Sequence, residues 1–92
     1  MNIHIRQDGT RVWECDEYLR REVTCSESRF GYIVQEQEQD VMSGVLYPVG
    51  EGGFFVDEAD AVLYGFGRAM ELALYLEEQR APSLIHIPAW CQ

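Results

Sequence analysis

The sequence predicts an α+β fold in which a single antiparallel β-sheet packs against one long α-helix. Two observations indicate this class. Residues 1–56 contain short runs of alternating apolar and polar side chains, separated by turn-forming residues. Residues 58–80 instead repeat apolar side chains at helical spacing. The chain has 92 residues, and we expect a single domain over residues 1–92.

The first half of the chain is expected to form three strand pairs. Asp8-Gly9 favours a tight turn in the first of them, and Pro48 places its segment at a sheet edge because proline cannot donate a backbone hydrogen bond. In chain order, the expected pairs are Asn2–Arg6 with Arg11–Cys15, Glu22–Cys25 with Phe30–Gln35 across Ser26–Arg29, and Gly44–Val49 with Gly53–Val56 across Gly50–Gly52.

The helix is expected over Glu58–Arg80, with Asp57 as its N-cap and Pro82 ending it. Two glycines, Gly65 and Gly67, either permit close packing on the sheet or mark a bend. Helical periodicity predicts a broad core-facing stripe of Val62, Phe66, Ala69, Met70, Ala73 and Leu76, flanked by Leu63 and Leu74.

A last strand is expected at Leu84–Pro88, where Ile85-His86-Ile87 repeats the pattern Ile3-His4-Ile5. The simplest arrangement puts both terminal strands in the same sheet, with their isoleucines facing the helix.

Composition favours a binding protein of the cytoplasm. Sixteen acidic residues against seven basic ones give a net charge of -9, which repels nucleic acid and anionic membranes and favours basic partners. All seven cations are arginines. Cys15, Cys25 and Cys91 show no C-x-x-C spacing, so we expect free thiols. No apolar segment approaches the roughly 20 residues that span a bilayer, and we expect no membrane association.

No combination of residues indicates catalysis, a cofactor or a metal. The expected strands place His4 and His86 opposite isoleucines, as surface histidines. A small enzyme or metal protein built on these histidines and a cysteine remains an alternative, although the spacing has no zinc signature.

Two acidic groups and one helix face are candidate binding surfaces. The run from Gln35 to Asp40 has no apolar face, so we expect it outside the core sheet; extended, it aligns Glu36, Glu38 and Asp40 at about the spacing of every second phosphate of a nucleic acid. The second acidic group is Glu14, Asp16 and Glu17. Solvated loops are the alternative interpretation of both groups.

The predicted outward face of the helix combines tyrosine and arginine, the residues that are enriched in interface hot spots. Its members are Asp60, Tyr64, Arg68, Glu71, Tyr75 and Glu78, of which the last five are the binding candidates. The alternative is that both tyrosines merely lie at the margin of the core stripe.

The chain resembles the phage-encoded anti-CRISPR inhibitors, in particular those against type I-F surveillance complexes. Its size, acidity and α+β pattern carry the resemblance, together with residues 1–6 (Met-Asn-Ile-His-Ile-Arg) and 85–91 (Ile-His-Ile-Pro-Ala-Trp-Cys). The resemblance implies a protein of the host cytoplasm that binds basic subunits of the RNA-guided complex and blocks target DNA binding.

The same resemblance implies direct contact with guide RNA, for which Arg20, Arg21 and Arg29 are the candidates because arginine suits bidentate phosphate contact. We expect a monomer or weak dimer. Two alternatives remain open: an immunity or antitoxin protein that plugs a basic nuclease site, and a structural subunit that oligomerises through the tyrosine-bearing helix face.

Overall fold

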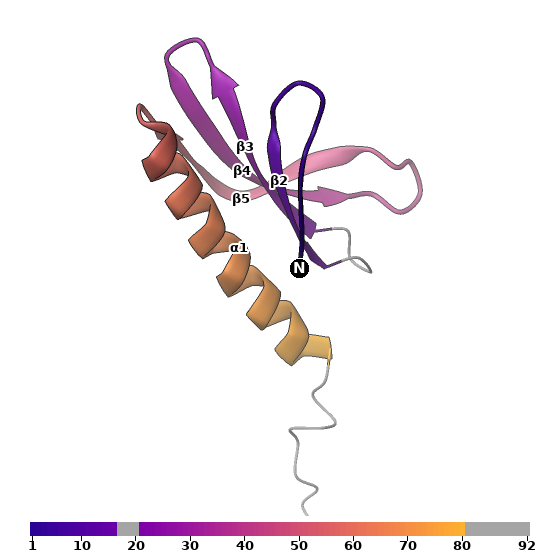
Figure 1. Ribbon diagram of the computed structural model, residues 1–92. Coiled ribbons are helices and arrows are strands. Elements are labelled where there is room, and N and C mark those ends of the chain that lie inside the picture. Colours follow the sequence, from indigo (N-terminus) through magenta and orange to yellow (C-terminus); the bar gives the residue numbers. More distant parts are fainter. Residues whose placement is uncertain (17–20, 81–92) are drawn as a thin grey trace, which may run out of the picture.

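A five-stranded antiparallel sheet packs against one long helix, and this confirms the predicted α+β class (Figure 1). The computed structural model describes residues 1–16 and 21–80. The strands are neighbours in chain order, β1-β2-β3-β4-β5. The elements are β1 Asn2–Ile5, β2 Arg11–Asp16, β3 Arg21–Ser28, β4 Gly31–Gln39, β5 Leu46–Phe55 and α1 Glu58–Arg80.

The first hairpin, β1–β2, forms as predicted. Gly9 has a φ of 90°, a left-handed conformation that glycine adopts without a Cβ clash. The Asp8 carboxylate accepts a hydrogen bond of 2.9 Å from the backbone N–H of Thr10. This bond, which lowers the pKa of Asp8, fixes the turn.

The second hairpin, β3–β4, is longer than predicted. Its turn contains only Arg29 and Phe30, because Ser28 already pairs with Gly31. At the other end β4 continues through Gln39, between β3 and β5. The expectation that the run from Gln35 lies outside the core sheet is therefore wrong. This polar run can lie within the sheet because one of its carboxylates forms a charge pair with the helix, described below.

The third predicted pair is also wrong, because β5 runs unbroken through the glycine segment. Val34 opposes Gly53 and Glu36 opposes Val49. Between these two pairs, β4 has one residue, Gln35, and β5 has three, Gly50, Glu51 and Gly52. This is an extended β-bulge, and Gly50 has the positive φ of 68° that such a kink requires. The edge position predicted from Pro48 is confirmed, since β5 is the last strand of the sheet.

The helix begins and ends as predicted. The Asp57 carbonyl accepts a hydrogen bond from the Ala61 N–H, which places Asp57 at the N-cap. Glu58 and Asp60 put negative charge in the first turn, where the helix dipole favours it.

The predicted core stripe of the helix is correct only in part: Ala69 and Leu76 are buried, and Val62 and Ala73 pack against the core. The buried residues are mostly small ones, namely Ala61, Gly65, Ala69, Leu72 and Leu76, whereas Phe66, Met70, Leu63 and Leu74 are exposed. The cause is Trp13 on β2, because a methyl group at Gly65 would lie 2.7 Å from its Cζ3. Gly65 thus permits close packing, while a methyl group at Gly67 would meet nothing within 4 Å.

The core lies between α1 and the strands β2, β3 and β4, where Cys15 and Cys25 are buried free thiols. Burial, followed by the negative charge of Glu36, raises the pKa of the Cys15 thiol to about 11. Among the described residues, no helix is long and apolar enough to cross a membrane. The predicted strand at Leu84–Pro88, with His86, and Cys91 lie outside the residues that the structure describes.

Candidate functional site

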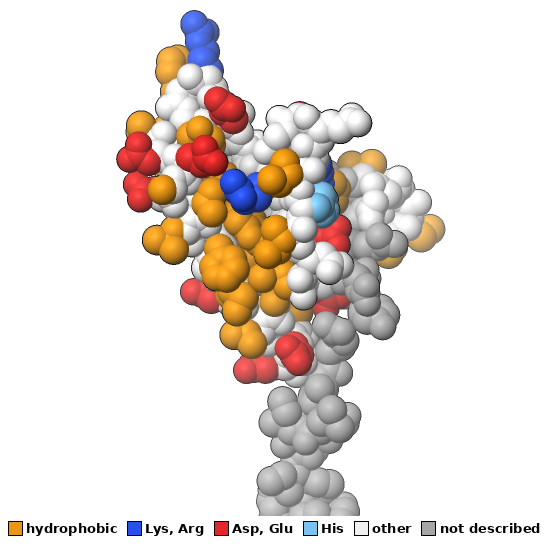
Figure 2. Space-filling model, viewed as in Figure 1, with side chains coloured by type: hydrophobic (Ala, Val, Ile, Leu, Met, Phe, Trp, Pro, Cys, Tyr) orange, Lys and Arg blue, Asp and Glu red, His pale blue; other side chains and the backbone are white. Residues whose placement is uncertain are grey.

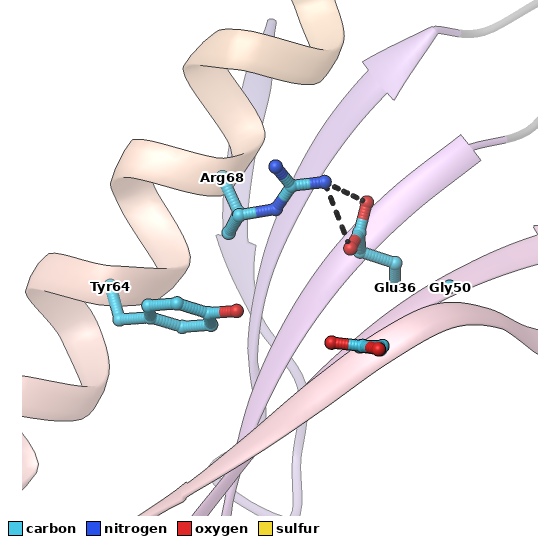
Figure 3. A pocket seen from close by; sticks show the side chains of 5 residues that line it. Glu36, Gly50, Tyr64 and Arg68 are labelled. Atoms are coloured by element: carbon cyan, nitrogen blue, oxygen red, sulfur yellow. Dashed lines mark hydrogen bonds and ion pairs between the residues drawn. The ribbon is translucent and has the colours of Figure 1, made fainter.

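A pocket of about 300 Å³ lies where α1 crosses β4 and the bulge of β5. Its lining combines two carboxylates, one guanidinium and one phenol: Glu36, Glu51, Arg68 and Tyr64, with the backbone of Gly50. Tyr64 and Arg68 reach from the helix toward Glu36 on the sheet (Figure 3).

The centre of the pocket is an ion pair between helix and sheet. One guanidinium nitrogen of Arg68 donates to both carboxylate oxygens of Glu36, at 3.0 and 3.1 Å. Glu36 is only 7% exposed, whereas the Arg68 side chain is about one-third exposed. The hydrogen bond to Glu36 is the main cause that raises the pKa of Arg68. Arg68 also donates to Glu71 at 2.8 Å, three residues along the helix.

The bulge forms the opposite wall of the pocket. A side chain at Gly52 would lie 2.6 Å from the Val34 carbonyl oxygen, and one at Gly50 would approach the Glu36 carboxylate at 3.3 Å. These glycines let β5 curve against β4 and leave Glu51 exposed at the pocket. Tyr64 is held on the other side by Phe55, at 5.0 Å between ring centroids.

The predicted carboxylate row is divided among three environments. Glu36 is buried against Arg68. Glu38 lies 3.7 Å from Arg21 and accepts a hydrogen bond of 2.8 Å from Tyr47, and this bond raises the pKa of the Tyr47 hydroxyl. Asp40 follows β4 and accepts from the N–H groups of Met42 and Ser43 in the next turn. The structure therefore does not present these three as one open row.

The second acidic group also includes a buried side chain. Asp16 is 5% exposed. Glu14 is partly exposed, 3.7 Å from Nδ1 of His4. Glu17 lies outside the described residues.

The predicted tyrosine–arginine face is divided as well. Tyr64 and Arg68 turn toward the pocket, and Glu71 pairs with Arg68, whereas Tyr75 and Glu78 are exposed nearer the C-terminal end of the helix. Tyr64 and Arg68 thus lie together with Glu36, a combination that the sequence analysis did not predict.

The candidate RNA-contacting arginines differ in accessibility. Arg21 is partly buried beside Glu38, and its Nε has no hydrogen-bond partner within the described structure. Arg29 is exposed at the tip of the β3–β4 hairpin, and its guanidinium carbon lies 5.4 Å from the centroid of the Phe30 ring. Arg20 lies outside the described residues.

Two features of the site, Glu51 and Gly50, are not predicted from the sequence, because the glycine segment has the composition of a hairpin turn. A usable signal was present: Pro48 and the residues after Gly52 both suit one continuous edge strand that is interrupted by a bulge.

The lining suits recognition of a basic side chain. Because Glu36 is already paired with Arg68, a guanidinium or ammonium group would pair with the exposed Glu51 carboxylate and stack on the Tyr64 ring. Within residues 1–16 and 21–80, no cluster of three His, Cys, Asp or Glu side chains is arranged to hold a metal ion. No protein-family model, curated protein or solved structure matches this chain significantly.

Proposed function

We propose that the chain is an acidic inhibitor of the anti-CRISPR type, which binds basic protein subunits of a type I-F surveillance complex and blocks target DNA binding. The observation that carries the proposal is the acidic and aromatic pocket of Glu36, Glu51, Tyr64 and Arg68. It offers a partner's lysine or arginine both charge and a ring to stack on.

The internal use of arginine supports the same proposal. Arg6, Arg11, Arg21 and Arg68 each lie within 4 Å of a glutamate of another element. Exposed carboxylates such as Glu51, Asp60 and Glu78 remain on the surface of a chain with a net charge of -9. Such a surface steers a basic partner toward it. Contact with guide RNA is assigned within this proposal to the exposed Arg29–Phe30 tip, since an aromatic ring and a guanidinium both stack on unpaired bases.

The direct test is affinity purification of the tagged chain from a host that carries a type I-F effector, with and without nuclease treatment. The proposal predicts recovery of the effector subunits with guide RNA. Recovery of a single nuclease without RNA would contradict it and support an immunity protein instead.

Glu51→Gln tests the pocket, because the exposed carboxylate is not part of the core. We expect roughly a fivefold to tenfold loss of affinity for the effector, the usual scale for one charge pair at an interface. Glu27→Gln, an exposed carboxylate on β3, is the matched control and should bind like the unmodified chain. Equal affinity of both variants would remove the pocket from the proposal.

A further inference from the structure

Four large apolar side chains lie exposed along the side of α1 that faces away from the sheet. They are Leu63, Phe66, Met70 and Leu74, hereafter the outer stripe. Leu63 is 73% and Leu74 is 56% exposed. At 100° per residue the four fall within an arc of about 80°, and they span three turns, or about 16 Å. Figure 2 shows apolar side chains gathered on this face, over the helix and beside it.

Packing of the helix does not explain the outer stripe. The sheet is already contacted by Ala61, Gly65, Ala69, Leu72 and Leu76 on the other side of α1. Helix stability does not need these side chains either, because alanine or a charged residue would serve an exposed helical position as well. Contiguous exposed apolar surface of this kind marks an interaction site.

The apolar surface also reaches the edge strand. Ile3 pairs with Trp13, and paired residues of an antiparallel sheet lie on the same face. Ile3 and Ile5 are therefore on the helix-bearing face, yet both are more than half exposed. They add exposed apolar area on the side of the sheet that carries the helix.

Charge decides which partner suits this surface. Asp60, Glu71 and Glu78 are exposed along one flank of the outer stripe, and Glu77 lies at its C-terminal end. A second copy in an antiparallel pair would bring the same acidic flank against this one, and two chains of net charge -9 repel each other.

We infer that the outer stripe is the docking surface for an amphipathic helix of the partner protein, with an apolar face and lysine or arginine along its flank. Apolar side chains spaced over three turns match the helix-in-groove mode of recognition, and the basic flank meets Asp60, Glu71 and Glu78. The inference rests on the proposed function only in requiring a protein partner, and it names a surface distinct from the Glu51 pocket.

The test uses a synthetic 18-residue helical peptide with leucines on one face, lysines on its flanks and alanine elsewhere, titrated into the full chain by calorimetry. A scrambled peptide of identical composition measures attraction by charge alone. We expect the patterned peptide to bind at least about tenfold more tightly than the scrambled one, since only it buries leucine side chains.

Leu63→Ser/Met70→Ser should remove this tenfold advantage, whereas Met42→Ser should keep it. Met42 is a matched control because it is 93% exposed and lies in the turn after β4. Chemical shifts of the wild-type amides on peptide addition give a readout that needs no variant: they should change along residues 63–74.

Three results would overturn the inference: equal binding of the two peptides, unchanged binding by a folded double variant, or amide shifts confined to other elements. A wild-type dimer in sedimentation that the double variant dissolves would assign the stripe to a second copy and overturn it too. Because the peptide assay contains no effector, its failure leaves the affinity-purification test of the proposed function intact, and Glu51→Gln should not change peptide binding.

Discussion

Gly65 sets how closely α1 approaches the sheet. A methyl group there would lie 2.7 Å from Cζ3 of Trp13, a rigid and buried ring that has little room to move. We expect Gly65→Ala to destabilise the fold by about 1–3 kcal/mol through overpacking, despite the better helix propensity of alanine.

Gly67→Ala is the matched control, since the same methyl group meets nothing within 4 Å there. This variant should be more stable by about 0.5–1 kcal/mol, the helix propensity difference alone. Urea denaturation of both variants measures the contrast. Stabilisation by both would show that Trp13 does not limit the helix position.

Cys15 should be an unreactive thiol. Burial is the main cause that raises its pKa from 9.0 to about 11, and the thiolate is the species that alkylates. At pH 8 the native thiol should therefore react with iodoacetamide about a hundredfold more slowly than in urea, apart from any further loss of access. A Cys25→Ser/Cys91→Ser background isolates the measurement, and equal rates in both states would contradict the assignment.

The same pKa shift predicts a loss of stability in alkali. A raised thiol pKa means that the native state prefers the protonated form. The contribution of the protonated Cys15 thiol to the stability of the fold is therefore complete below pH 9.0. It declines as the pH rises from 9.0 toward about 11, where the native thiol also ionises. Thermal denaturation across this range should show a smaller decline for Cys15→Ala than for the unmodified chain.

At the scale of elements, the Glu36–Arg68 pair ties α1 to β4. Arg68→Met leaves a buried carboxylate without its charged partner, and we expect a loss of about 2–4 kcal/mol, less than for a fully buried pair because Arg68 is partly exposed. Glu36→Gln should cost about 1–2 kcal/mol, since the amide can still accept a hydrogen bond.

The double variant Glu36→Gln/Arg68→Met should be more stable than the sum of the two losses implies, with a coupling energy of about 1–3 kcal/mol. Urea denaturation of the four proteins completes the cycle. Strict additivity would mean that the pair seen between helix and sheet contributes nothing in solution.

The predictability of the elements follows from how local their causes are. The β1–β2 hairpin and the helix limits depend on Asp8-Gly9 and on Asp57, whose effects act within a few residues. The position of β4 in the sheet depends on the ion pair between Glu36 and Arg68. These residues are 32 positions apart in the sequence, and no local pattern predicts such a pair. The helix face depends on Trp13 in the same way, because size alone favours burying Phe66 and Met70.

The candidate site was predicted only in part for the same reason. Tyr64, Arg68 and Glu36 were each identified as binding candidates, but on two separate surfaces. Glu51 entered the site only through the bulge, which depends on the positive φ of Gly50 and on the Val34 carbonyl that closely approaches Gly52.

At the scale of the whole molecule, we propose an acidic protein with two distinct contact surfaces, the Glu51 pocket and the outer stripe. The charge-steered contribution should weaken with salt, because the Debye length falls from about 14 Å at 50 mM to about 4 Å at 500 mM. The apolar contribution of the outer stripe should persist. The affinity for the effector, measured over a range of salt concentrations, should therefore separate the two surfaces. Glu51→Gln should reduce the salt dependence of the affinity. Leu63→Ser/Met70→Ser should lower the affinity at every salt concentration.

The most direct test of the central claim is binding of labelled target DNA to a purified type I-F surveillance complex, with increasing amounts of this chain. The account predicts that DNA binding is lost once the chain saturates the complex, and that Glu51→Gln shifts the effective concentration upward by about fivefold to tenfold. Undiminished DNA binding at a large excess of the chain would contradict the claim.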